Sequence, residues 1–143
     1  MICPDINLLL YATFRSFDQH PRAKHWWDSV LSSPQTVGIG HVVAMGFLRL
    51  ATNPRTFTQP LRITQAVEVI DGWLQQPNVR LLSPPDSHWQ HYRQMLLAST
   101  VGGNLTTDAH IAALAKDFGL VIYTNDADFS RFPGVKWVNP LLE

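Results

Sequence analysis

The sequence predicts an α/β protein built on an open, mainly parallel sheet of about four to five short strands, flanked by helices. Apolar periodicity alternates between short β-like runs and longer helical stretches, as strands joined by crossover helices require. The run from Leu120 to Tyr123 is short and fully apolar, which is typical of a buried central strand. With 143 residues, 45% hydrophobic and 15% charged, the chain can bury a core and is expected to form one domain over residues 1–143.

The first half of the chain is expected to contain a strand, two helices, a strand and a helix. We expect these elements over residues 2–3, 8–11, 21–32, 35–39 and 42–52. The helix over 21–32 has apolar side chains at i, i+3, i+4, i+7 and i+8, and Pro21 suits a first helical turn. The helix over 42–52 should end near Asn53, because Pro54 disfavours helical geometry in the residue before it.

The second half continues with a helix, a strand, two helices and two strands. We expect these over residues 63–74, 79–82, 89–96, 107–118, 120–123 and 135–138. Two prolines close the strand over 79–82, and Asp86 is expected to cap the helix that follows. Two glycines interrupt the chain before the helix over 107–118, and Gly119 suits the C-terminal cap of that helix.

Composition narrows the functional classes. Lys+Arg and Asp+Glu both number 11, so the net charge is zero and any binding of nucleic acid must rely on a local basic patch. The single Cys3 cannot form an internal disulfide, and the N-terminus does not look like a secretory signal, so we expect a reducing cytosol. The apolar run from Leu8 to Ala12 is far shorter than the roughly 20 residues of a membrane span, so no membrane segment is expected.

Three carboxylates fall where a binding crevice is expected. Asp5 ends the first strand, Asp126 follows the strand over 120–123, and Asp108 lies at the start of the preceding helix. The carboxyl ends of parallel strands share one edge, so these side chains could converge. Two carboxylates about 4 Å apart repel by roughly 4 kcal/mol at an effective dielectric near 20, which a hard divalent cation such as Mg²⁺ relieves.

Each acidic residue also has a purely structural interpretation. Asp108 favours the positive end of its helix without any ligand, and Asp126 and Asp128 can simply shape a turn. Spacing alone leaves both interpretations open. The consistent topological positions of the three aspartates favour the metal site.

Four ordered blocks of the chain resemble those of VapC-type PIN-domain toxins. The blocks run from Pro4 to Ala12, from Phe47 to Arg55, from Gly103 to His110 and from Thr124 to Phe132, and they span nearly the whole chain. The resemblance implies a PIN-like fold and a Mg²⁺- or Mn²⁺-dependent endoribonuclease. It also implies a homodimer and a cognate antitoxin that neutralises the toxin.

The resemblance also assigns roles to individual residues. Asp5, Asp108 and Asp126 would form the catalytic metal site. Three further side chains would support it, two by hydrogen bonding and the third by helping to hold metal or water: Asn7, Thr124 and Asp128.

The chain departs from the family pattern at Gly46, where the family usually has a glutamate. Gly46 also costs roughly 1 kcal/mol relative to alanine inside the expected helix. It shares one helical face with Arg49, and we expect that face to be directed toward the acidic pocket. The missing acidic residue predicts weak or impaired activity. It also keeps an alternative open, a catalytically inactive PIN-fold module that binds antitoxin or RNA.

Weaker candidates remain. A metal-dependent phosphatase rests only on the acidic cluster, without a nucleophile motif. His88 and His91 have the spacing of two metal ligands on a helix, but we interpret them as surface or interface histidines. Trp26 and Trp27 could stack on bases, but packing in the core or in a dimer, together with Trp73, is the stronger interpretation. Three basic side chains are candidate phosphate contacts near the entrance of the site: Arg15, Arg22 and Lys24.

Overall fold

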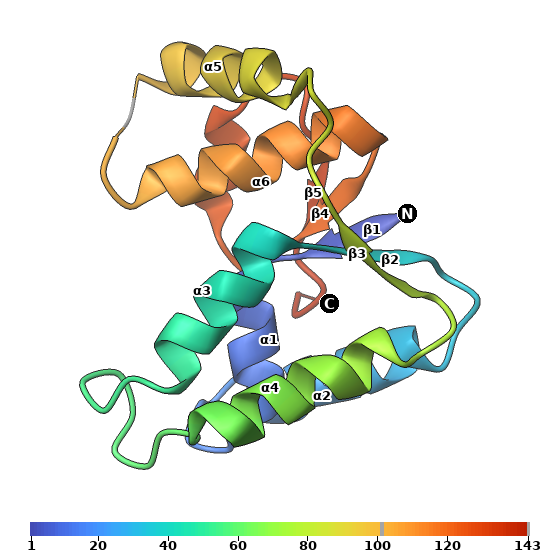
Figure 1. Cartoon of the computed structure of the whole chain (residues 1–143), viewed down its shortest axis with the longest axis vertical. Helices are drawn as coiled ribbons and strands as arrows, with labels where there is room; N and C mark the ends of the chain where they lie inside the picture. The colour runs from blue at the N-terminus through green and yellow to red at the C-terminus, as the bar shows by residue number, and fades with distance from the viewer. Residues whose placement is uncertain (101, 143) are drawn as a thin grey trace.

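A computed structural model describes residues 1–100 and 102–142 as a five-stranded sheet with helices on both sides (Figure 1). The strands are β1 (Ile2–Pro4), β2 (Val37–Gly40), β3 (Val79–Leu82), β4 (Val121–Tyr123) and β5 (Trp137–Val138). Their order across the sheet is β3-β2-β1-β4-β5, and every neighbouring pair is parallel. The α/β class, the parallel sheet and the five strands expected from the sequence are therefore confirmed.

Within the described residues, six α-helices and one 3-10 helix connect the strands. They are α1 (Ile6–Thr13), α2 (His20–Leu31), α3 (His41–Ala51), α4 (Ile63–Leu74), α5 (His88–Ser99), α6 (Leu105–Phe118) and the 3-10 helix η1 (Ala127–Arg131). Figure 1 shows α5 and α6 together on one side of the sheet, and α1, α2 and α4 on the other. Among the described helices, none is long and apolar enough to cross a membrane.

The register of β1 and β4 places the ends of the two strands side by side. Pro4 pairs with Tyr123, and the backbone N–H of Asp5 continues the ladder by donating to the carbonyl of Tyr123 at 2.9 Å. Asp5 and Thr124 therefore follow neighbouring strands at the same edge of the sheet. This is the topological basis of the candidate site, because side chains that follow parallel strands share that edge.

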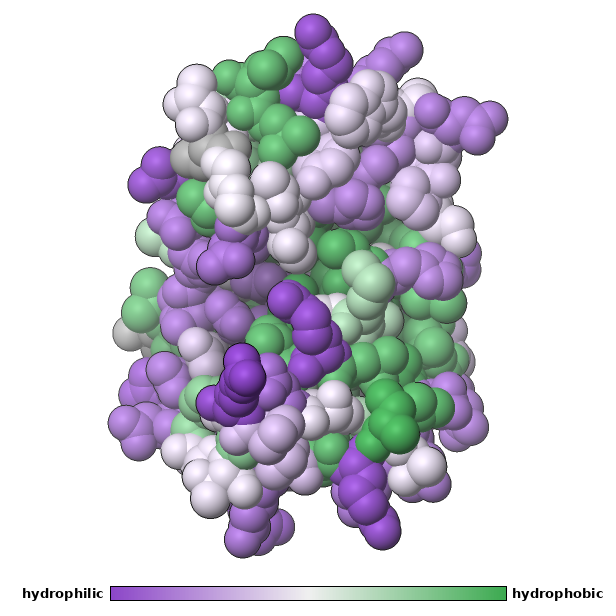
Figure 2. Space-filling view, turned by 60° about the vertical axis from the view of Figure 1, so that its left-hand side comes forward, coloured by the Kyte–Doolittle hydropathy of each residue, from purple (hydrophilic) through white to green (hydrophobic). Residues whose placement is uncertain are grey.

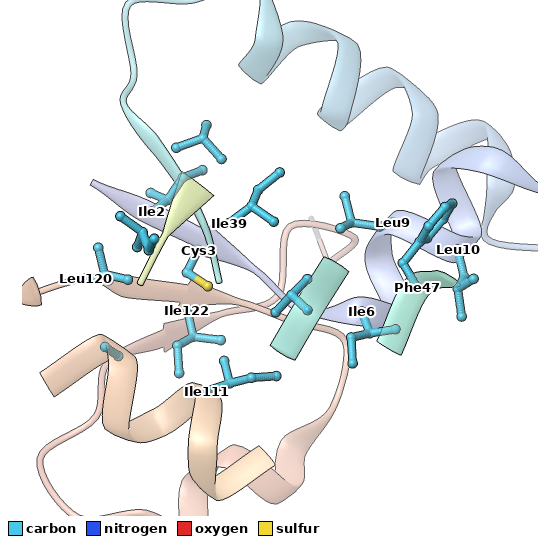
Figure 3. Close-up of a cluster of buried hydrophobic side chains, with 14 of the residues drawn as sticks. Ile2, Cys3, Ile6, Leu9, Leu10, Ile39, Phe47, Ile111, Leu120 and Ile122 are labelled. Carbon is cyan, nitrogen blue, oxygen red and sulfur yellow. The ribbon is translucent and has the colours of Figure 1, made fainter. Parts of the chain in front are cut away.

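The core fills the space between the sheet and both helical layers (Figure 3). Helix α1 is apolar around most of its circumference, and Leu8 and Leu9 are fully buried. Trp27 and Trp73 also belong to the core of the single chain, where their rings meet edge to face at 5.7 Å. Of the two interpretations, packing in the core or in a dimer, packing in the core is therefore confirmed for Trp27 and Trp73.

Two local details differ from the sequence-based expectation. Helix α5 begins at His88 after Ser87, and Asp86 does not cap it. The 3-10 helix η1 was not expected, because a five-residue segment carries no helical periodicity. The expected cap at Gly119 is confirmed: its φ is 65°, a left-handed conformation, and its N–H donates to the carbonyl of Ala115.

Helices α5 and α6 are joined by a buried carboxylate. The Nδ1 atoms of His88 and His91 both hydrogen-bond to Asp117, whose side chain is fully buried. His110 packs against His88 with ring centroids 4.3 Å apart, and burial together with His88 lowers the pKa of His110. His88 is 8% exposed, so the interpretation of it as a surface histidine is wrong.

Candidate functional site

An acidic pocket of about 450 Å³ lies at the carboxyl edge of β1 and β4. It is lined by residues from α1, α3, the start of α6 and the segment after β4: Asp5, Ile6, Asn7, Arg49, Leu50, Gly103, Asn104, Thr107, Asp108 and Asp126. The three aspartates singled out in the sequence therefore line one shared pocket. Their role as metal ligands stays a prediction.

Asp5 is held rigidly at the bottom of this pocket. It is 3% exposed, and its two carboxylate oxygens accept hydrogen bonds from the N–H of Ile6 at 2.7 Å and from the hydroxyl of Thr124 at 2.8 Å. Burial raises the pKa of Asp5, the two hydrogen bonds oppose that rise, and the charge of Asp126 adds to it. Each oxygen keeps a second lone pair, so the fixed carboxylate can still bind a cation.

Thr124 connects the first and last aspartates. Its buried hydroxyl donates to Asp5 and accepts from the N–H of Asp126 at 3.0 Å. Asp126 in turn caps η1, because its Oδ1 accepts from the N–H of Asp128 at 2.8 Å. Asp126 therefore both shapes the turn and lines the acidic pocket.

Asp108 carries the clearest electrostatic sign of crowding. It lies in the first turn of α6 and is half-buried. Burial, followed by the charges of Asp5, Asp126 and Asp128, raises the pKa of Asp108 to about 7. The carboxylates thus repel one another in the metal-free protein, and a divalent cation would relieve that repulsion.

The donor set fits a hard cation that retains water. Within residues 1–100 and 102–142, no three His, Cys, Asp or Glu side chains come close enough together to coordinate one ion directly. Mg²⁺ commonly uses only one or two carboxylates and fills its remaining positions with water and substrate oxygens. The carboxylates of Asp5, Asp108 and Asp126 are oxygen donors of the type that Mg²⁺ and Mn²⁺ prefer.

Gly46 is explained by close packing between α1 and α3. A Cβ atom at this position would lie 2.3 Å from Cδ1 of Ile6 and 3.1 Å from its Cγ1. Ile6 itself lines the acidic pocket, whereas Gly46 is buried beneath it. The cost of glycine inside the helix is therefore offset by the packing of Ile6. A glutamate at position 46 would reach the pocket only if Ile6 moved.

The remaining predicted residues are dispersed. Asn7 lines the acidic pocket, whereas the half-exposed Asp128 pairs with Arg131 at 3.4 Å. None of the three basic candidates lines the acidic pocket. Arg15 lines a separate pocket at the end of α1, Arg22 donates to the carbonyl of Leu141, and Lys24 pairs with Asp28 along the exposed side of α2.

Three polar residues that line the acidic pocket had no role predicted from the sequence. Arg49 lies in the last turn of α3, one helical turn after Gly46, so its placement follows from the shared face. Asn104 and Thr107 lie near the N-terminus of the helix that carries Asp108. Their closeness to Asp108 in the sequence is the feature from which their place in the pocket could have been predicted.

Comparisons with known proteins agree with this geometry. The family model described as "PIN domain" matches residues 2–135. Ribonuclease VapC33 of Mycobacterium tuberculosis is 39% identical over 143 residues, covering 100% of both chains. The chain also resembles two crystal structures in fold. One is the VapC20 toxin of M. tuberculosis, with a TM-score of 0.70 and 22% identity over 95% of this chain and 99% of the other. The second is VapBC2 of Rickettsia felis, with a TM-score of 0.69 and 18% identity over 97% and 98%.

Proposed function

This chain belongs to the PIN-domain family, among the VapC ribonucleases, and we propose that its acidic pocket hydrolyses RNA phosphodiester bonds with a bound Mg²⁺ or Mn²⁺ ion. One observation carries the proposal. Asp5, Asp108 and Asp126 line a single pocket in which the pKa of Asp108 is raised to about 7. Repulsion between crowded carboxylates destabilises the folded protein, and a cluster that binds a cation explains why these acids lie together.

The pocket also carries a group that can hold the substrate. Arg49 is exposed at its rim and, within the described residues, forms no ion pair. Its guanidinium offers planar, paired donors that match the oxygens of a phosphate. We assign Arg49 to the phosphate of the RNA backbone, which would otherwise be repelled by the three carboxylates.

The remaining residues position the reacting groups. Thr124 and the N–H of Ile6 fix the carboxylate of Asp5, so that its free lone pairs point in a constant direction. Asp108 must lose its proton to act as a ligand, which makes cation binding weaker at low pH. A divalent cation held by these carboxylates would polarise the phosphate as a Lewis acid and would make a bound water more acidic.

The relatives suggest the setting of this activity. A solved structure from Klebsiella pneumoniae with the same fold is a toxin–antitoxin complex, and we propose that an antitoxin likewise binds this chain. We also propose a homodimer, as the family resemblance implies, with exposed apolar side chains such as Met45, Trp89 and Leu97 as candidate contacts. We place the protein in the cytoplasm, where its RNA substrate is synthesised.

An inactive binding module is the alternative, motivated by Gly46. The named relatives are ribonucleases, which does not favour it. Close packing of Ile6 also accounts for the glycine without any loss of the three aspartates. We therefore propose an active enzyme that works with three acidic residues.

The test is RNA cleavage by the purified chain. Bulk tRNA and rRNA are incubated with Mg²⁺, with Mn²⁺ or with chelator, and the 5′ ends of the products are mapped. We expect metal-dependent cuts that Asp126→Asn abolishes, while Asp71→Asn on the exposed side of α4 leaves them unchanged. Cleavage that persists in chelator or in Asp126→Asn would show that another site, or a contaminant, is responsible.

A further inference from the structure

A second pocket opens at the end of α1 opposite the carboxylates. It encloses about 480 Å³, and we call it the Arg15 pocket. It is lined by two short segments of chain: Phe14, Arg15, Ser16, Thr56, Phe57, Thr58 and Gln59. The lining combines one cation, three hydroxyl groups, one amide and two aromatic rings, with no carboxylate. This composition favours an anionic ligand that also has hydrogen-bonding groups.

The floor of the Arg15 pocket is rigid. The rings of Phe14 and Phe57 stack with centroids 3.8 Å apart and an angle of 7°, and both are largely buried. The loop after α3 is tied back by the N–H of Phe57, which donates to Asn53, and by the N–H of Leu61, which donates to Ala51. The pocket is therefore formed before any ligand arrives, which lowers the entropic cost of binding.

The polar groups above this floor are free to bind. Arg15, Ser16, Thr56, Thr58 and Gln59 are all exposed. Within the described parts of the chain, none of these five side chains forms a hydrogen bond or ion pair with another residue. A ligand can therefore use them without first breaking contacts inside the protein.

The same two segments connect this pocket to the acidic pocket. Helix α1 begins at Ile6, beside the carboxylates, and ends next to Phe14, a length of about 12 Å at 1.5 Å per residue. Along the other segment, Arg49 lines the acidic pocket and Thr56 follows shortly after the end of α3. Figure 2, turned so that the left-hand side of Figure 1 comes forward, shows hydrophilic side chains mainly on the left and centre of its middle and lower part, and a hydrophobic area on the right.

We propose that the Arg15 pocket binds a nucleotide of the substrate RNA a short distance along the strand from the phosphate that is cut. Arg15 contacts a backbone phosphate, and the hydroxyl groups with Gln59 contact the ribose and the base edge. This subsite rests on the proposed ribonuclease function and adds the place where the enzyme holds the flanking RNA. A protein partner is the competing occupant, and the unpaired Arg15 guanidinium among free hydroxyl and amide groups favours RNA over it.

The test compares RNA oligonucleotides of two lengths. Binding is measured by fluorescence anisotropy with Mg²⁺ in the Asp126→Asn background, which prevents cleavage, using a mixed-sequence RNA of about 12 nucleotides and a dinucleotide. Arg15→Ala should weaken binding of the long RNA about tenfold and reduce the salt slope by about 0.7, the value for one contact with a single strand. Dinucleotide binding at the acidic pocket should not change.

A matched control removes the same charge elsewhere. Arg80 is exposed on β3 and lines neither pocket, so Arg80→Ala should leave both affinities unchanged. In the active chain, Arg15→Ala should raise KM more than it lowers kcat, and Arg15→Lys should restore part of the affinity. Gln59→Ala should weaken long-RNA binding without changing the salt slope, because it removes no charge.

Each other outcome overturns the subsite. Equal losses in Arg15→Ala and Arg80→Ala would indicate general charge attraction, and unchanged affinity in Arg15→Ala would exclude a contact. If Arg15→Ala weakened only the complex with an antitoxin, the pocket would be a protein interface. In the last two cases RNA cleavage by the unmodified chain would keep the proposed function intact. No binding and no cleavage of RNA by the unmodified chain would overturn both.

Discussion

Replacing Gly46 by alanine tests the explanation of the most unusual residue near the site. Alanine is the better helix former, so at an open helical position it should stabilise the protein by up to about 1 kcal/mol. At position 46, the new Cβ would lie 2.3 Å from Cδ1 of Ile6. We therefore expect Gly46→Ala to lower the free energy of unfolding despite its better helix propensity.

The expected magnitude follows from this contact. Carbon atoms normally approach to about 3.5–4.0 Å, so the tip of Ile6 must move by roughly 1 Å or more within a packed core. Overpacking of this kind costs about 1–3 kcal/mol. After the helix gain, the net effect should lie between nearly neutral and about 2 kcal/mol destabilising. Because Cδ1 is the flexible end of the side chain, we expect the lower part of the range.

Urea unfolding of four variants measures this contact. Gly72→Ala, in α4, adds a methyl group where nothing lies within 4 Å, and it should stabilise the protein. Ile6→Val removes the clashing Cδ1 atom itself. Alone, Ile6→Val should lower the free energy of unfolding by about 0.5–1.5 kcal/mol. The double variant with Gly46→Ala should lose about 1 kcal/mol less than the sum of the two single losses. If Gly46→Ala were as stabilising as Gly72→Ala, and additive with Ile6→Val, the packing explanation of Gly46 would be refuted.

Three further predictions concern Asp108, Asp117 and Gly46. Because the pKa of Asp108 is raised in the folded state, its ionisation lowers the free energy of unfolding as the pH rises from about 4 to 7. Asp108→Asn should therefore stabilise the metal-free protein by about 1–2 kcal/mol at pH 8, allowing for the partial exposure of this side chain, and by less at pH 5. Urea titrations at both pH values check this. Asp117→Asn leaves one histidine without its acceptor and should cost about 1–3 kcal/mol in the same assay. Gly46→Glu should raise metal-dependent RNA cleavage only when it is combined with Ile6→Ala, because the smaller side chain frees the space beside position 46. Cleavage assays of the single and double variants test this.

The parts of the fold that follow from chain periodicity were predictable. The strand ends after Pro4 and Tyr123 follow from short apolar runs, and they place Asp5 and Asp126 at one edge of a parallel sheet. The helix over 63–74 matched α4 residue for residue, because its apolar spacing is continuous. These features depend on local sequence and on one topological rule, so a single sequence contains them.

Other parts depend on packing between distant segments. The contact of Ile6 with Gly46 requires the distance between α1 and α3, which no local pattern specifies. The bonds of His88 and His91 to Asp117 join two helices, so no local pattern indicated that these histidines pair with a buried carboxylate. The hydrogen bond from Thr124 to Asp5 follows from strand register, and only the family resemblance indicated it in advance.

A structure of the protein crystallised with Mn²⁺ tests the central claim most directly. Anomalous scattering locates the ion without reference to the protein atoms. The account predicts Mn²⁺ in the acidic pocket, bound to carboxylate oxygens from among Asp5, Asp108 and Asp126 and completed by water, and it predicts that Asp108→Asn reduces its occupancy. Mn²⁺ bound elsewhere in crystals of a chain that cleaves RNA would contradict the assignment of this pocket as the catalytic site.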